Sequence, residues 1–140
     1  MASGIYNRFK ANLMSGAVNL DSGGDTIKVA LLDDNHSFVA DHDTWSDVSA
    51  NEISGTGYTA GGETLTNQSV TQDDTNDKAV FDADDVSWTS ATFTAYHAVL
   101  YDDTLASDDL ICSIDFGGAK SVSNGTFTIQ WDADGIITLS

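Results

Sequence analysis

Residues 91–101 read Ala-Thr-Phe-Thr-Ala-Tyr-His-Ala-Val-Leu-Tyr, and this stretch decides the fold class. Alternation places Phe93, Ala95, His97, Val99 and Tyr101 on one face of an extended strand, and Thr92, Thr94, Tyr96, Ala98 and Leu100 on the other. Both faces are largely apolar, aromatic or β-branched, which is typical of a central strand in a sandwich. We therefore predict a central strand over residues 91–101.

Shorter stretches of strand character lie on both sides of this one, at residues 26–32, 79–81, 86–88, 110–116, 126–131 and 136–139. They are separated by turn sequences at residues 33–35, 82–85, 117–118 and 132–135, and by a tight hairpin turn at Ser123-Asn-Gly125. Residues 51–66 predict a weaker strand broken by glycines, and the polar residues 67–78 predict a loop. Together they predict one mainly β domain over residues 1–140, an antiparallel β-sandwich or jelly roll of about eight strands.

The N-terminal segment, residues 1–16, is the one stretch with a convincing helical period. Ser3 is the predicted cap, and Gly16 ends the pattern. The apolar positions are Ile5, Tyr6, Phe9, Leu13 and Met14. One interpretation is that this apolar stripe closes one end of the β core. The other is that the segment is a docking arm, in which Ile5, Tyr6, Arg8, Phe9 and Lys10 bind a partner and the two cations meet acidic groups there.

The chain is strongly acidic, with 22 acidic residues, five basic residues and a formal net charge of −17. This charge disfavours direct binding to nucleic acid or to an anionic membrane, because phosphate groups would be repelled. Asp accounts for 20 of the acids, and Asp favours turns over helix interiors. The single cysteine, Cys112, excludes an internal disulfide framework. The sequence shows neither a membrane-spanning run nor a signal-peptide pattern, so we expect a protein made in a cytoplasm.

No motif predicts catalysis. The three histidines, His36, His42 and His97, lack metal-ligand spacing, and there is no nucleophile elbow and no phosphate loop. Asp132-Ala-Asp-Gly135 begins like a calcium loop but lacks the later ligands. We expect a protein that is not an enzyme, with no catalytic residues, no cofactor and no metal site.

The tryptophans offer one alternative function. Trp88 and Trp131 fall within predicted strands, where core packing is the better interpretation, whereas Trp45 lies in a polar segment and is the most exposed of the three by this reasoning. An exposed Trp45 would suit a carbohydrate-binding β-sandwich, in which the ring stacks on a sugar.

Three stretches also carry a family resemblance. They are residues 6–14 with 27–31, the central residues 48–58, and residues 88–103 continuing through 125–131. Over nearly the whole chain, these stretches resemble small virion structural proteins of tailed bacteriophages.

Within that class the resemblance favours a head decoration (cement) protein. It implies a chain that binds the major capsid protein on the capsid exterior, reinforces joints between capsid subunits, and assembles as a homo-oligomer, most often a trimer. A tail, adaptor or receptor-binding component of the virion is the alternative within the same class.

Overall fold

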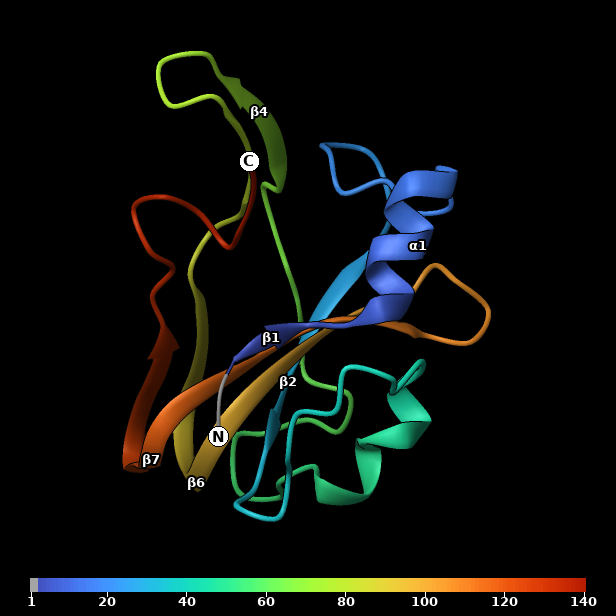
Figure 1. The fold of residues 1–140 in the computed structure, drawn as a ribbon. Helices are drawn as coiled ribbons and strands as arrows, with labels where there is room; N and C mark the ends of the chain where they lie inside the picture. The colour runs from blue at the N-terminus through green and yellow to red at the C-terminus, as the bar shows by residue number, and fades with distance from the viewer. Residues whose placement is uncertain (1–2) are drawn as a thin grey trace.

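The computed structural model describes residues 3–140, which form eight strands, one α-helix and two short 3₁₀ helices (Figure 1). The elements are β1 (Gly4–Ile5), α1 (Asn7–Ser15), β2 (Ile27–Leu32), η1 (Trp45–Asp47), η2 (Ser49–Asn51), β3 (Glu63–Thr64), β4 (Ser69–Asp73), β5 (Lys78–Asp82), β6 (Val86–Asp102), β7 (Asp109–Ile129) and β8 (Ile137–Leu139). The chain is therefore mainly β, as the alternation predicts.

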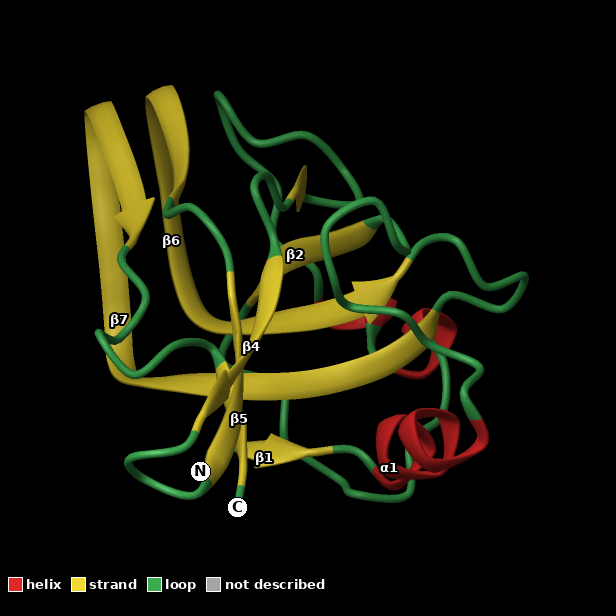
Figure 2. Cartoon of the chain, turned by 90° about the horizontal axis from the view of Figure 1, so that it is seen from above, coloured by secondary structure: helices red, strands yellow, loops and turns green. Residues whose placement is uncertain are grey.

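Two antiparallel sheets make up the fold. The five-stranded sheet has the order β1-β7-β6-β2-β3, and the three-stranded sheet has the order β4-β5-β8. Figure 2 shows β4 and β5 crossing the long strands β6 and β7. The prediction of an antiparallel β-sandwich of about eight strands is confirmed.

Strand β6 contains residues 91–101 and is the middle strand of the larger sheet, as predicted. The prediction that one face runs straight through these residues is wrong. Ala95 belongs to the same apolar cluster as Ala98, whereas Val99 belongs to the cluster on the opposite face. The face changes beside Tyr96, where β7 carries four residues (Phe116 to Ala119) opposite one. A bulge of this kind bends the strand that it interrupts, which is β7, and Figure 2 shows the paired strand β6 bending with it.

The turns predicted at Gly117-Gly118 and Ser123-Asn-Gly125 are also wrong, because β7 runs through both. Asn124 has φ 47° and lies at a second bulge in β7, near a bulge at Ser90 in β6, which has φ 49°. Asn-Gly is a strong hairpin signal, but here the positive φ serves a bulge within a continuous pair of strands. The true hairpin turn of β6 and β7 is the segment 103–108.

Two further predictions need correction. Residues 67–78, predicted as a loop, contain β4 and the tight turn that leads into β5, in which Asp73 Oδ1 accepts hydrogen bonds from the backbone N–H groups of Thr75 and Asn76. Ser3 does not cap the helix: its hydroxyl accepts a hydrogen bond from the backbone N–H of Asp115. Tyr6 occupies the N-cap position.

The end of helix α1 is as predicted. Gly16 has φ 76°, and its backbone N–H closes the last turn onto Leu13. Glycine reaches this left-handed conformation without a steric penalty, so Gly16 stops the helix at the residue that the pattern indicates.

The core lies on both faces of the larger sheet. One face carries the larger apolar cluster, which includes Ile27, Val29 and Leu31 of β2 together with Phe9, Phe81 and Trp88. The opposite face carries a smaller cluster of Tyr6, Ala30, Leu32, Val48, Val99, Tyr101 and Leu110. Gly62 permits the close approach of the β3 turn to β2, since a Cβ there would overlap the Val29 carbonyl.

Candidate docking groove

An apolar groove lies between helix α1 and the three-stranded sheet, which face each other in Figure 1. Its volume is about 490 Å³. We call it the docking groove and define it by Ile5, Phe9, Lys10 and Leu13, by residues 18–21, by Val70, by residues 79–81 and by residues 137–139. Its walls therefore come from the N-terminal segment, from the loop before β2 and from the second sheet.

Strand register explains why one wall is apolar. Val70 pairs with Phe81, and Phe81 pairs with Ile137, so these three side chains form a row across the sheet. The next row on the same face contains Ala79 and Leu139. Side chains two residues apart share a face of a strand, so both rows point into the groove.

Burial decreases from the base of the groove to its mouth. Phe9 and Phe81 at the base are each 3% exposed. At the mouth Leu13 is 38%, Val70 42% and Leu139 62% exposed. Clustered apolar side chains left in water are typical of a surface that binds another molecule.

Hydrogen bonds hold the loop wall, residues 17–26, against the second sheet. The Asp21 carboxylate accepts bonds from the backbone N–H groups of Ser22 and Val70 (2.8 and 3.1 Å), and these bonds lower the pKa of Asp21. The Gln68 amide donates to the carbonyls of Leu20 and Asp25 at 2.9 and 3.0 Å. The groove is therefore formed before any partner arrives.

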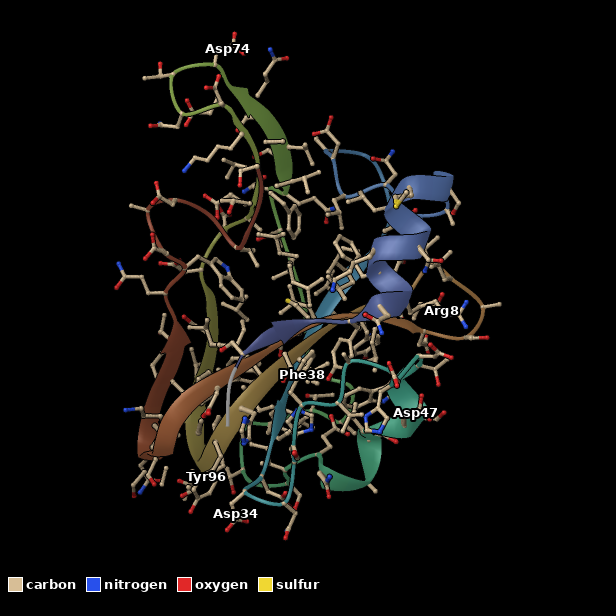
Figure 3. The ribbon with its side chains drawn as sticks, in the orientation of Figure 1. Arg8, Asp34, Phe38, Asp47, Asp74 and Tyr96 are labelled. Atoms are coloured by element: carbon tan, nitrogen blue, oxygen red, sulfur yellow. The ribbon has the colours of Figure 1, made fainter. Side chains whose placement is uncertain are left out.

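The structure places the five predicted partner-binding residues in three different environments. Tyr6 is fully buried and Phe9 nearly so, and both pack in the core. Ile5 is half-buried in β1 and lines the groove with the exposed Lys10. Arg8 lies beside the turn between β6 and β7, with Nη2 3.2 Å from Asp43 Oδ2 and Nε 4.0 Å from Asp109 Oδ2 (Figure 3). Ile5 and Lys10 are thus the two that a partner in the groove would meet.

Trp45, predicted as the most exposed tryptophan, is half-buried. Its ring stacks on Tyr101 with 4.8 Å between centroids and an interplanar angle of 18°, and it packs against the smaller core cluster. One ring face is therefore already covered by protein. Trp88, by contrast, is buried as expected, with 1% exposure.

The structure brings together two histidines that are distant in sequence. His36 and His97 are 2% and 6% exposed, and their ring centroids are 4.9 Å apart. His36 Nε2 lies 2.9 Å from Ser113 Oγ, and His97 Nδ1 lies 3.9 Å from Asp115 Oδ1. Neither His36 nor Ser113 borders the docking groove. A hydrolytic nucleophile must be reachable by its substrate, so a serine 2% exposed is not positioned for that reaction.

This pair predicts a loss of stability in acid. Burial, with smaller contributions from His97 and His42, lowers the pKa of His36 to about 4. The unfolded chain binds this proton near pH 6.5, so the folded state loses stability as the pH falls from 6.5 towards 4, by about 3 kcal/mol over that range. Urea unfolding of the wild type and His36→Gln at several pH values measures the difference. Parallel pH profiles for the two proteins would show that His36 does not titrate in this way.

The carboxylates of the Asp-rich turns accept hydrogen bonds from the protein itself, both within a turn and from distant segments. Asp132 Oδ1 accepts a bond from the Asp134 N–H, Asp85 Oδ1 from the Trp131 N–H, and Asp84 Oδ2 from the Asn67 amide. Within residues 3–140, no three or more His, Cys, Asp or Glu side chains are grouped so that they could hold a metal ion.

Comparison with known proteins gives no relative: no protein-family model, no curated protein and no solved structure matches the chain. In the described part of the chain, no helix has the length and apolar character needed to cross a membrane.

Sequence reasoning did not find the docking groove. Its mouth depends on Val70, which lies in the stretch predicted as a loop, and on Leu139 in the last strand. One signal was present: the polar residues 73–77 stand between Ser69-Val-Thr71 and Ala79-Val-Phe81, which is the pattern of a hairpin.

Proposed function

We propose that this chain is a non-enzymatic structural protein of a virion, a head decoration protein that binds the outer surface of the capsid through the docking groove. The observation that carries the proposal is the groove itself, with Leu13, Val70 and Leu139 exposed at its mouth. The resemblance to small virion proteins of tailed bacteriophages supplies the partner, an apolar segment of the major capsid protein.

The energetics suit a protein that acts in many copies. Full burial of a Val or Leu side chain contributes about 1.5–3 kcal/mol, and the three mouth residues begin partly buried, so a single contact is modest. Many copies that each bridge neighbouring capsid subunits add up to a strong reinforcement. In this proposal the copies form trimers on the capsid, as the resemblance implies.

The charge supports the same arrangement. A net charge of −17 keeps free copies apart in solution and opposes contact with packaged nucleic acid, which is also negative. Self-association would therefore follow binding to the capsid, where the capsid contact offsets the repulsion. Lys10 at the groove gives the partner one positive charge to meet.

The proposal can be tested by measuring DNA release from virions that lack the chain. We expect them to release DNA at a lower temperature, and after milder osmotic shock, than complete virions, because the capsid joints lose their reinforcement. Adding back the purified chain should restore the original release temperature. Equal release curves with and without the chain would contradict the proposal, as would localisation of the chain to the tail alone.

A further inference from the structure

Asp102, at the end of β6, is a buried acid that the docking groove does not use. It is 1% exposed, and its Oδ1 accepts a hydrogen bond of 2.9 Å from the backbone N–H of Thr104. Its Oδ2 is buried, and within residues 3–140 it has no hydrogen-bond donor. A buried carboxylate oxygen without a donor is costly, so a positive charge or a proton is expected beside it.

The group beside Asp102 is a second carboxyl, that of Asp25. Ile27 pairs with Asp102 across β2 and β6, and the Asp103 N–H donates to the Thr26 carbonyl at 2.9 Å. This register sets Asp25 at the end of β6, with its carboxyl within hydrogen-bonding reach of Asp102. Asp25 Oδ2 already accepts a bond of 3.0 Å from the backbone N–H of Asn19. Two ionised carboxylates cannot hydrogen-bond to each other, because neither has a hydrogen to donate. A single proton on the pair turns this repulsion into a hydrogen bond.

Among the residues that the structure describes, no basic side chain acts on Asp102 in place of that proton. The groups that act on Asp102 are the Asp25 carboxyl and the backbone N–H groups of Thr104 and Leu105. On β7, the cross-strand partner Asp109 accepts a bond from Asn12 and faces Arg8. On β2, Lys28 acts on Asp108 in the following turn. Asp103, the next residue in the chain, is exposed.

We infer that Asp25 and Asp102 share one proton in the folded protein, and that this proton fastens residues 17–26 to the end of β6. These residues include Val18, Asn19, Leu20 and Asp21, which form one wall of the docking groove. Loss of the proton leaves two negative charges facing each other and loosens that wall. The consequence for capsid binding rests on the proposed function, whereas the shared proton does not.

The pH range follows from the surroundings of Asp102. Burial, and then the Asp25 carboxyl, raise the pKa of Asp102 to about 7. The unfolded chain loses this proton near pH 4, whereas the folded chain keeps it to about pH 7. The shared proton therefore contributes its full stabilisation below pH 4, and this contribution is lost as the pH rises from 4 to 7. The neutral His36 makes the folded state more stable as the pH rises over nearly the same range. The two effects oppose each other, so the pH dependence of the wild-type stability alone does not reveal either of them.

Comparison with Asp102→Asn isolates the pair, because the asparagine amide donates to Asp25 at every pH and the histidines are unchanged. We expect the unfolding constant of the wild type, divided by that of Asp102→Asn, to rise about tenfold per pH unit between pH 4 and 7 and to stay constant above pH 7. Asp103→Asn removes an exposed carboxylate one residue away and should leave this ratio flat. Asp25→Asn serves as the second variant, because the amide at position 25 would donate its hydrogen bond to the Asp102 carboxylate.

Two measurements on the free protein complete the test without any capsid. The Asp102 Cγ chemical shift should titrate near pH 7, and hydrogen exchange at Asn19 and Asp25, corrected for intrinsic rate, should accelerate above that pH in the wild type only. A flat ratio for Asp102→Asn, or an Asp102 Cγ shift that titrates near pH 4, would overturn the inference. So would a rise in the melting temperature of the wild type, but not of Asp102→Asn, on addition of Ca²⁺ at pH 8, because a cation would then occupy the pair. Each outcome is independent of whether the chain binds a capsid.

Discussion

Replacing Trp88 with alanine is expected to lower the free energy of unfolding by about 4 kcal/mol. Trp88 is 1% exposed and contacts three aromatic rings, those of Tyr58, Phe93 and Phe127, at centroid distances of 6.1, 6.4 and 6.0 Å. Its removal leaves a cavity in the larger apolar cluster, and the aromatic neighbours lose their packing partner. Urea unfolding followed by circular dichroism measures the change.

Trp88→Phe is the matched control. The indole Nε1 of Trp88 is buried without a hydrogen-bond acceptor, and a buried donor without a partner costs about 1–3 kcal/mol. Phenylalanine removes that cost while keeping most of the ring, so we expect a loss under about 1.5 kcal/mol. An alanine variant as stable as the phenylalanine variant would mean that Trp88 is not at the centre of the core.

If the chain docks on a capsid as we propose, Leu139→Asp is expected to weaken that binding by about 100-fold or more while leaving the chain folded. Leu139 is 62% exposed, so the free protein has little packing to lose. In the complex the new carboxylate would be buried against an apolar partner without a compensating charge, which costs several kcal/mol. Co-sedimentation of the purified variant with capsids that lack the chain measures the affinity.

Val39→Asp controls for the added charge and for general surface effects. Val39 is 43% exposed, which is close to the 42% exposure of the groove residue Val70. Val39 itself lies in the loop before η1, outside the docking groove. We expect this variant to bind like the wild type. Equal loss of binding in both variants would show that net charge, and not the groove, controls the contact.

Local sequence pattern is sufficient to predict an element when the signal for it lies within a few residues. The alternation in residues 91–101 located the middle strand, and Gly16 located the end of the helix, because both effects act within a few residues. The bend beside Tyr96 was not predictable in this way. It arises from extra residues in β7, about 20 positions further along the chain.

The groove and the acidic pair illustrate what local pattern leaves out. Val70, Phe81 and Ile137 form one row only because three strands pair in a particular register. Asp25 and Asp102 are 77 positions apart and meet only after β2 has paired with β6. In each case the sequence shows the residue type, whereas the contact depends on the tertiary fold.

The proposed docking on a capsid is tested most directly by a cryo-EM map of the virion to which we assign this chain. We expect regularly repeated density on the outside of the capsid, with helix α1 and the three-stranded sheet turned towards the major capsid protein and the docking groove filled by one of its segments. Density for the chain at the tail alone, or on the capsid with the docking groove facing solvent, would contradict it.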